Sequence, residues 1–344
     1  MRAFVIAIIA AFCATAIIVR MMSGYLAKRG IVDIPNERSS HSQHTPRGGG
    51  LGIAVVFLCG VLVLEQRDLL SRELCLALVG GGTVVAVVGF LDDCFRVGRA
   101  LRLITHLGAS GWALVCLGGM GPLFLRQVHV HWGWLGQCVG LIGVTWMINL
   151  YNFMDGIDGL AGIETLCTGG MGALLLTWVG LSGYGVCAAM LSAAVAGFLV
   201  WNWPPARIFM GDVGSGFIGF VLGVLAIASA KERPQLLWPW MILLSVFIVD
   251  ATITLVRRGL SGKQWYEAHC SHAYQHAAKR FGGHLVVDLV VLGINVLWLA
   301  PLAWIAVEYP RWDVILTTLA AFPLVFLVLT LGAGREEVAL HQRN

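Results

Sequence analysis

The stretch GSGFIGFVLGVLAIASA, residues 214–230, decides the fold class of this chain. It runs for seventeen residues without a charged side chain, and a helix of about that length crosses the ~30 Å hydrocarbon core of a bilayer. A strand of a membrane β-barrel would alternate apolar and polar residues at period two, and this stretch does not. It therefore predicts a transmembrane helix.

Ten further apolar stretches extend outward from this one in both directions. Together the expected spans cover about residues 3–22, 49–65, 73–91, 103–121, 135–151, 160–180, 185–203, 214–230, 237–256, 286–307 and 313–332. The chain is 58% hydrophobic and 12% charged, with a mean hydropathy of +0.80, whereas about a quarter of the residues in soluble domains are charged. We therefore expect an all-α, polytopic membrane helix bundle of about eleven transmembrane helices, formed by residues 1–344 as a single domain.

Lys and Arg residues are divided unequally between the two sides that successive spans create. One set of connections carries fifteen and the other seven, and cytoplasmic connections are normally the richer in Lys and Arg. This asymmetry predicts an N-terminus outside and a C-terminus in the cytoplasm. The net charge of +4 is small and spread over several loops, which argues against a nucleic-acid partner.

Acidic residues gather in the loops of the predicted cytoplasmic side, and NLYNFMDGIDGL, residues 149–160, is the richest of these segments. Asn149 and Asn152 are three residues apart, as are Asp155 and Asp158, so each pair shares a helix face. Amides and carboxylates at a membrane surface suit a diphosphate–metal complex. The alternative is a polar turn with Asn and Asp caps, but four such groups in ten residues exceed what capping needs.

Two further acidic motifs adjoin spans on the same side. Asp92 and Asp93 are adjacent carboxylates, which repel each other unless a metal ion or a shared proton relieves them. In FMGDVGS, residues 209–215, glycines surround Asp212, and Ser215 follows three residues later. This pattern suits a metal ligand on a tight turn before a helix N-terminus, which favours phosphate. A solvated loop start and a plain glycine-rich turn are the alternatives.

Basic and hydroxyl groups fill the first loop of the predicted cytoplasmic side. Arg38, Ser39, Thr45 and Arg47 precede the three glycines of residues 48–50, and such a loop can cradle a phosphate or a lipid headgroup. The alternative is a positively charged membrane anchor. Both interpretations place the loop at the cytoplasmic surface.

A histidine-rich segment, HCSHAYQH at residues 269–276, follows the ninth expected span. His269, His272 and His276 recur at spacings of four or less, so they share a helical face. Three histidines so spaced could bind zinc. Cations follow them and no thiolate pair accompanies them, so we favour phosphate contacts. A plain amphipathic helix at the membrane interface is the alternative.

Together these segments resemble one family, the polyprenyl-phosphate N-acetylhexosamine-1-phosphate transferases of glycosyltransferase family 4. Within that family they are similar to the undecaprenyl-phosphate GlcNAc-1-phosphate transferases of the branch that initiates O-antigen synthesis. The matching pieces are Thr45–Gly50, Asp92-Asp93, Asn149–Leu160, Phe209–Ser215 and Ser271–Gln275. They occur in the family's order, which makes the resemblance specific.

The resemblance implies an eleven-helix bundle in the bacterial inner membrane, with the active site facing the cytoplasm. It implies a Mg²⁺ ion, for which Mn²⁺ can substitute, and a homodimer is common in this fold. The implied substrates are a UDP-N-acetylhexosamine and undecaprenyl phosphate, which lies among the membrane lipid. The implied reaction moves the sugar-1-phosphate onto the lipid phosphate, releases UMP and initiates O-antigen or another surface glycan in lipopolysaccharide biosynthesis.

The resemblance also implies residue roles. The expected catalytic residues are Asp92, Asp93, Asp155, Asp158 and His272. The expected substrate-binding residues are Arg38, Ser39, Thr45, Arg47, Asn149, Asn152, Phe209, Ser215, His269 and Gln275. The expected metal ligands are Asp212 and Asn152. Phe209 would stack on the uracil, and Asp92 or Asp93 would deprotonate or orient the attacking lipid phosphate.

The last motif departs from the family pattern. Many members have three clustered histidines or an arginine there, whereas this chain has Cys270 before Ser271 and His272, and Gln275 in place of a third histidine. The departure favours the surface-glycan branch over the alternative, a phospho-N-acetylmuramoyl-pentapeptide transferase of peptidoglycan synthesis. A transporter or flippase for lipid-linked substrates would place charges near the bilayer midplane, and a structural scaffold would not need the acidic loops.

One aspartate lies apart from all these motifs. Asp288 stands in an apolar run, and the nearest polar residue in the sequence is His284. We therefore expect turnover to depend on Asp212 and to be nearly independent of Asp288.

Overall fold

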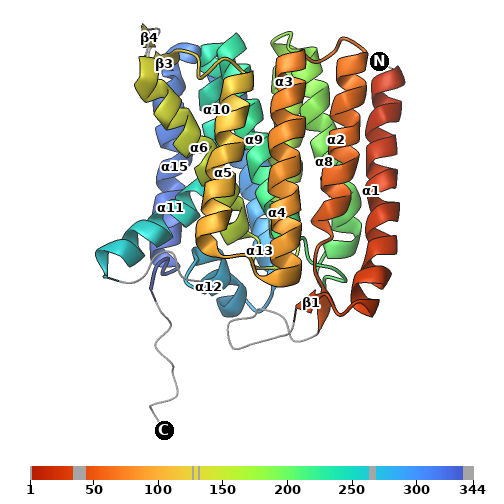
Figure 1. Ribbon diagram of the computed structural model, residues 1–344. Coiled ribbons are helices and arrows are strands. Elements are labelled where there is room, and N and C mark those ends of the chain that lie inside the picture. Colours follow the sequence, from red (N-terminus) through yellow and green to blue (C-terminus); the bar gives the residue numbers. More distant parts are fainter. Residues whose placement is uncertain (1, 34–43, 126–127, 131, 263–268, 336–344) are drawn as a thin grey trace.

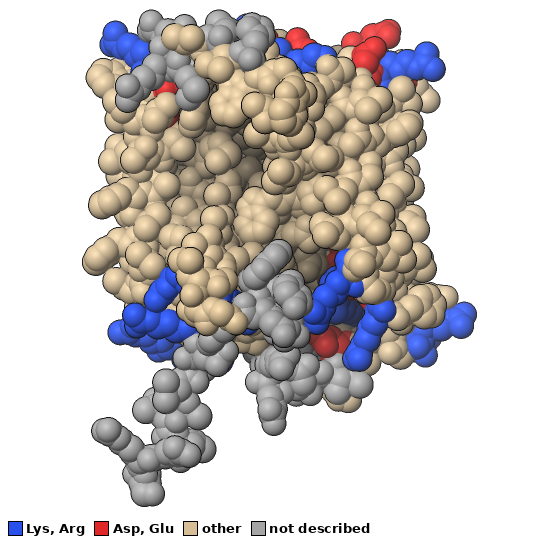
Figure 2. Space-filling view, turned by 60° about the vertical axis from the view of Figure 1, so that its left-hand side comes forward, with Lys and Arg blue, Asp and Glu red and all other residues tan. Residues whose placement is uncertain are grey.

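The structure is a computed structural model that describes residues 2–33, 44–125, 128–130, 132–262 and 269–335. Most of its helices run lengthwise through one bundle, with connections at the two ends, while α11 runs obliquely and α12 lies at one end (Figure 1). Charged side chains gather at those ends, and a broad uncharged belt lies between them (Figure 2). A bilayer requires such an arrangement, because helices satisfy their own backbone hydrogen bonds within the hydrocarbon.

Helices account for most of the described residues. Those of the first half are α1 (Arg2–Lys28), α2 (Gly50–Gln66), α3 (Arg72–Leu76), α4 (Gly82–Phe95), α5 (Arg99–Cys116), α6 (Gly133–Met154), α7 (Leu160–Trp178) and α8 (Ser182–Asn202). Those of the second half are α9 (Asp212–Glu232), α10 (Leu237–Leu243), α11 (Ser245–Leu260), α12 (Ala273–Arg280), α13 (His284–Ile294), α14 (Ala300–Glu308) and α15 (Asp313–Thr330).

Short elements complete the chain. The π-helical segments η1 (Ala77–Gly81) and η3 (Asn295–Leu299) join α3 to α4 and α13 to α14, and the 3₁₀ turns η2 (Pro234–Leu236) and η4 (Pro310–Trp312) precede α10 and α15. Strand β1 (Val32–Asp33) pairs antiparallel with β2 (Thr45–Pro46). Strand β3 (Leu123–Leu125) pairs antiparallel with β4 (Val128–Val130) at the opposite end of the bundle.

The all-α, polytopic membrane fold is confirmed, but the count of eleven spans is not. Among the described residues, eight helices are long and apolar enough to cross a membrane. A ninth span results if Pro234–Leu243 and Ser245–Leu260, which meet at a bend of 73°, count as one. Each expected span overlaps a helix, but α2 has only seventeen residues and α5 begins with Arg99, Arg102 and His106. These polar residues lower the hydropathy of α5. They line the site described below, which explains why polar residues stand in this helix.

Helix α9, whose sequence decided the fold class, is the centre of the bundle. Every residue from Val213 to Ala230 is buried. Neighbouring helices approach it closely at glycines: a Cβ on Gly219 would lie 2.3 Å from the carbonyl oxygen of Met147, and one on Gly89 would lie 2.6 Å from that of Asp212. Small residues allow such close helix contacts in membranes. The start of α9 is therefore packed directly against α4.

Candidate active site

Two loops meet at the N-terminus of α9. The amide of Phe209 donates to the carbonyl of Pro46 at 2.8 Å, and the carbonyl of Phe209 accepts from the amides of Gly48 and Gly49 at 3.2 and 2.9 Å. Arg47 and Phe209 form an isolated parallel β-bridge. The basic loop and the FMGDVGS turn are therefore joined like neighbouring strands, which carries Arg47 to the start of α9.

Glycine is required where these loops touch. Gly211 has a φ of +76°, and a Cβ there would lie 2.4 Å from Asp93 Oδ2. A Cβ on Gly50 would lie 2.1 Å from the Cα of Gly214. A side chain at either position would push the acidic turn away from its neighbours, so the glycines in both motifs have a steric explanation.

Five charged side chains form what we name the carboxylate–arginine cluster: Arg47, Asp92, Asp93, Arg102 and Asp212. Asp93 accepts hydrogen bonds from the amides of the first two residues of α9 at 2.9 and 3.2 Å, and it lies 2.7 Å from Arg47 Nε. Arg102 Nη1 contacts Asp92 at 2.6 Å and Asp212 at 2.9 Å. Arg47 also donates to Asp212. The cluster thus ties together α4, α5, α9 and the basic loop.

Negative charge dominates this part of the protein. Burial alone would lower the pKa of Arg47, but the carboxylates of Asp212 and Asp93 raise it above its ordinary value. Asp155, directly after α6, has its pKa raised well above the ordinary value by burial, and Asp212 and Asp93 raise it further against the opposing effect of Arg47. Four carboxyl groups therefore face two guanidinium groups, an excess that a cation would relieve.

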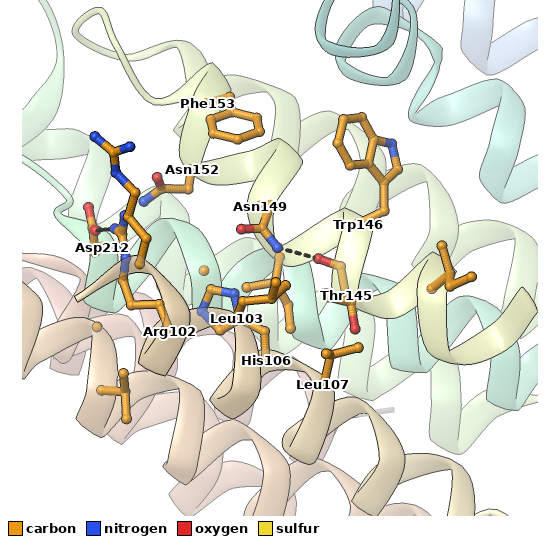
Figure 3. Close-up of a pocket in the computed structure, with 16 residues that line it drawn as sticks. Arg102, Leu103, His106, Leu107, Thr145, Trp146, Asn149, Asn152, Phe153 and Asp212 are labelled. Carbon is orange, nitrogen blue, oxygen red and sulfur yellow. Dashed lines mark hydrogen bonds and ion pairs between the residues drawn. The ribbon is translucent and has the colours of Figure 1, made fainter. Parts of the chain in front are cut away.

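A cavity of about 400 Å³ extends from the cluster between α4, α5, α6 and α9 (Figure 3). Its polar end holds Arg102, Asn152 and Asp212. Further along, its walls are apolar, with Leu103, Leu107, Ile142, Trp146 and Ile148. Leu103 and Ile142 are 49% and 64% exposed on the outer surface of the bundle. The cavity therefore runs from a charged group at one end of the bundle to the surface that faces lipid.

Polar side chains from α6 line the middle of this cavity. Asn149 donates to the carbonyl of Thr145 at 2.7 Å, and Figure 3 shows it beside His106. Asn152 donates to the hydroxyl of Ser215 at 3.2 Å, and Ser215 donates to the carbonyl of Gly211 at 3.1 Å. Asn152 is thus linked to the turn that carries Asp212.

Comparison with known proteins decides the family. The profile described as "Glycosyl transferase family 4" matches residues 75–230. This range includes Asp92, Asp93, the Asn149–Leu160 segment and Asp212, which the structure assembles around the start of α9. The chain belongs to glycosyl transferase family 4.

Individual relatives of this family 4 protein come from several bacteria. It is 29% identical to the "Probable undecaprenyl-phosphate N-acetylglucosaminyl 1-phosphate transferase" of Bacillus subtilis (strain 168), over 83% of this chain and 80% of the relative. It is 30% identical to the "Decaprenyl-phosphate N-acetylglucosaminephosphotransferase" of Mycolicibacterium smegmatis, over 68% of this chain and 65% of the relative. It is 25% identical to the "Undecaprenyl-phosphate alpha-N-acetylglucosaminyl 1-phosphate transferase" of Escherichia coli (strain K12), over 86% of this chain and 82% of the relative.

The structure of the family 4 protein brings many of the predicted site residues together. Those in or beside the cluster and the cavity are Arg47, Asp92, Asp93, Asn149, Asn152, Asp155, Asp212 and Ser215. Phe209 is half-buried in the same turn, and Thr45 is buried in β2. Arg38 and Ser39 lie outside the described residues.

Sequence reasoning missed Arg102 and His106. Arg102 bridges two of the predicted carboxylates and lines the cavity, whereas in the sequence it is only one of the fifteen Lys and Arg residues on the predicted cytoplasmic side. The sequence does contain a pattern that indicates these residues. Arg99, Arg102 and His106 recur at spacings of three and four and therefore share one face of α5. That face lines the cavity.

Asp158 lies in different surroundings from Asp155, three residues earlier. Its Oδ2 accepts from the amide of Ala206 at 3.0 Å and lies 3.3 Å from His284 Nδ1. The side chain is thus engaged by the loop after α8 and by the start of α13. Its contacts are those of a residue that fixes loops, and its catalytic role stays a prediction.

The histidine-rich motif forms the start of α12 and packs on the end of α6. His272 is buried, with 2% exposure, and its Nδ1 lies 3.3 Å from Asp250 Oδ1. Gln275 accepts from the amide of His272 at 3.2 Å. Burial, together with His272 and Arg258, lowers the pKa of His269 to about 3. None of the three predicted residues lines the cavity, so their contact with substrate stays a prediction.

The predicted magnesium ligands can be tested against the side chains present. No group of three or more His, Cys, Asp or Glu residues in the described ranges is arranged to hold a metal ion. Arginines bind the cluster's carboxylates. The donors nevertheless fit magnesium in kind, because Mg²⁺ often takes one or two carboxylates and completes its shell with water and substrate phosphates. The excess of carboxyl groups over guanidinium groups agrees with that fit.

Proposed function

We propose that this protein transfers an N-acetylhexosamine-1-phosphate, GlcNAc-1-phosphate or that of a related N-acetylated sugar, from a UDP-sugar to undecaprenyl phosphate. The names of its relatives support transfer of a sugar phosphate to a polyprenyl phosphate. One observation carries the proposal: the cavity joins a charged cluster at one end of the bundle to apolar walls on the lipid-facing surface. An amphiphilic phosphate substrate needs both environments at once.

The acceptor lipid would lie along the cavity. Its phosphate would contact Arg102, whose guanidinium group can hold phosphate oxygens through two hydrogen bonds. Its first isoprene units would contact Leu103, Leu107 and Trp146, which form the apolar wall. The remaining chain would leave between α5 and α6 into the bilayer, because the exposed residues of that wall face outward.

The water-soluble donor would enter from the loops. Phe209 lies in the turn beside the cluster and would stack on the uracil, as family resemblance implies. Asn152 and Asp155 would contact the nucleotide and the diphosphate. Arg47 would offset the charge of the diphosphate as it does that of Asp212 and Asp93. The donor and the acceptor phosphate would then meet at the start of α9.

The transfer is a displacement at phosphorus. An oxygen of the lipid phosphate forms a bond to the phosphorus atom attached to the sugar, and the bond from that phosphorus to the oxygen of UMP breaks, so UMP leaves with the electron pair. Asp92 or Asp93 would orient the acceptor or take its proton. Arg102 and Arg47 would hold the anionic reactants close together, which is the main requirement of phosphoryl transfer.

Asp212 and Asn152 would hold a magnesium ion. When bound, the ion would offset the charge of the donor and acceptor phosphates. Chelation by EDTA should abolish transfer, and Mg²⁺ or Mn²⁺ should restore it. Full transfer in the presence of excess chelator would remove the metal from the proposal and leave the arginines as the only cations.

We place the cluster end of the bundle on the cytoplasmic side of the bacterial inner membrane. The Lys and Arg asymmetry supports this orientation, and the termini of the described chain lie at opposite ends of the bundle (Figure 1). A reporter fused after Asn344 should be active only if it senses the cytoplasm. A periplasmic signal there would reverse the proposed orientation.

A donor panel tests the proposed function. The purified protein, undecaprenyl phosphate and Mg²⁺ are combined with UDP-GlcNAc, with other UDP-linked N-acetylhexosamines or with UDP-MurNAc-pentapeptide, and UMP and the lipid product are measured. We expect product with an N-acetylhexosamine donor and none with the pentapeptide donor. Absence of UMP with every donor would contradict the proposal and leave lipid transport as the alternative. Rescue of a strain that lacks initiation of O-antigen would assign the pathway.

A further inference from the structure

Asn202, the last residue of α8, lies between the two loops that carry Asp155 and Asp212. Its side chain is buried, with 4% exposure. Its Oδ1 accepts from the amide of Gly159 at 3.0 Å, and its Nδ2 donates to the carbonyl of Ile208 at 2.9 Å. One amide side chain therefore joins the backbone of the 155–159 turn to the backbone of the loop before Asp212.

Asp158 makes a second connection between the same two loops. It lies in the 155–159 turn, and its Oδ2 accepts from the amide of Ala206 at 3.0 Å. The amide of Asp158 donates to His284 Nδ1 at 3.3 Å, so α13 supports the turn from the other side. We name Asn202 and Asp158 the loop brace, because together they fix residues 155–159 relative to residues 206–208.

The loops held by the brace carry the groups that the proposed function assigns to the donor. Asp155 begins one loop, and Phe209 directly follows Ile208 in the other. Ile208 is fully buried and leaves its loop little freedom to move independently. A misplacement of about 1 Å between reacting groups can cost about a hundredfold in rate. The relative position of these loops therefore matters for binding the donor.

We propose that Asn202 is a positioning residue, which holds Phe209 and Asp155 at the separation that UDP-sugar binding requires. The inference rests on the proposed function, because it assumes that these loops bind the donor. Asn202 itself contacts neither the cavity nor the carboxylate–arginine cluster. Its effect on the reaction would therefore pass through the loops it joins.

A purely structural role for Asn202 is the competing explanation. Asparagine side chains commonly hydrogen-bond to neighbouring backbone groups and thereby stabilise the local structure. Here, however, both hydrogen bonds of the side chain reach loops outside α8. A structural role predicts lower stability with unchanged kinetics of the folded fraction. Positioning predicts a selective loss in the use of the donor.

Two substitutions separate these explanations. Asn202→Asp keeps the acceptor for Gly159 and removes the donor to Ile208, and Asn202→Leu removes both. We expect kcat/KM for the UDP-sugar to fall about tenfold and about a hundredfold, respectively, at roughly a factor of ten for each buried hydrogen bond. The KM for undecaprenyl phosphate should change less than about twofold, because the brace does not contact the cavity.

A matched control loses a similar contact elsewhere in the bundle. Thr168 is buried in α7 and donates to the carbonyl of Leu243 at 3.3 Å. Thr168→Val removes this hydrogen bond at nearly constant volume and touches neither loop. Its folded fraction should keep wild-type values of both KM and kcat. An equal loss in Thr168→Val and Asn202→Asp would contradict a positioning role.

A double-mutant cycle shows whether Asn202 acts through Phe209. If Asn202 positions Phe209, the combination of Asn202→Asp with Phe209→Ala should lower kcat/KM for the donor hardly more than Phe209→Ala alone. Independent effects that multiply would overturn the proposal. If Asn202→Leu does not yield folded protein, Asn202→Asp and this cycle decide the question. Failure of the proposed function would show as no transfer by the wild type, whereas failure of this inference leaves wild-type transfer intact.

Discussion

The two ends of the bundle both carry acidic residues, but they use them differently. At the end near α3, Asp68, Glu73 and Glu308 are exposed, and Glu308 accepts a hydrogen bond from Trp178 at 2.5 Å. At the other end, the side chain of Asp93 has 0% exposure and that of Asp212 has 13%, and both contact arginine. Figure 2 shows charge at both ends. The number of acidic residues at an end of the bundle therefore does not show where the site lies. The site is identified by carboxylates that are buried beside backbone amides and arginines.

The largest expected effect separates these two kinds of acid. Asp212→Asn keeps the size of the side chain and removes the charge that would hold magnesium, so turnover should fall about a thousandfold, equivalent to ~4 kcal/mol. Asp68→Asn makes the same change on the exposed loop at the other end of the bundle and should leave turnover unaltered. Turnover is measured on folded, purified protein at saturating Mg²⁺. More than about a tenth of wild-type turnover in Asp212→Asn would erase the distinction between the two ends.

Basic residues at the two ends of the bundle can be compared in the same way, with Arg102 at the cavity and Arg72 at the opposite end. Arg102→Ala removes the guanidinium group at the polar end of the cavity and should lower kcat/KM for undecaprenyl phosphate about a hundredfold, since charge-assisted hydrogen bonds contribute about 1.5–3 kcal/mol. Arg102→Lys keeps the charge without the fork and should lose less. Arg72→Ala, on the exposed start of α3, is the control. An unchanged acceptor KM in Arg102→Ala would place the acceptor phosphate elsewhere.

Phe209 tests whether the loop beside the cluster binds the base of the donor. Phe209→Ala should raise the KM for the UDP-sugar about tenfold, because stacking of a base on an aromatic ring contributes about 1–3 kcal/mol. Phe209→Trp should be milder, since indole can also stack. The acceptor KM should stay constant in both variants. Equal losses in Phe209→Ala and Phe209→Trp would indicate that Phe209 packs the turn and does not bind uracil.

Asp288 should show the smallest effect among the acids near the site. The structure places it fully buried, with its Oδ2 against Gly159, where an added Cβ would lie 2.4 Å away. Neither of its oxygens accepts a hydrogen bond from the described residues. Asp288→Asn should therefore change turnover less than about threefold, or below ~1 kcal/mol. A thousandfold loss would show that burial alone, without arginine contacts, can mark an essential acid here.

The sequence alone determined the fold class and predicted several residues of the candidate site, though not Arg102 or His106. An apolar run long enough to cross a bilayer must form a helix if it is to satisfy its backbone there, so GSGFIGFVLGVLAIASA was decisive without tertiary information. Short motifs with acids and glycines at loop ends also predicted that Asp92, Asp93 and Asp212 would meet. Local spacing and composition suffice for such predictions, because helix formation and loop chemistry depend on neighbouring residues.

Only the tertiary structure decided what individual members of these motifs contact. Asp155 and Asp158 share a motif and a predicted role, yet Asp155 faces the charges of the cluster and Asp158 binds the loop at Ala206. His272 is buried against Asp250, and its predicted contact with the substrate stays a prediction. Arg102 contacts Asp212, and Asn202 is hydrogen-bonded to Gly159 and Ile208. Neither set of contacts can be predicted from the neighbouring sequence. These contacts join residues from different helices, and the packing of the helices, which no local pattern encodes, determines which side chains meet.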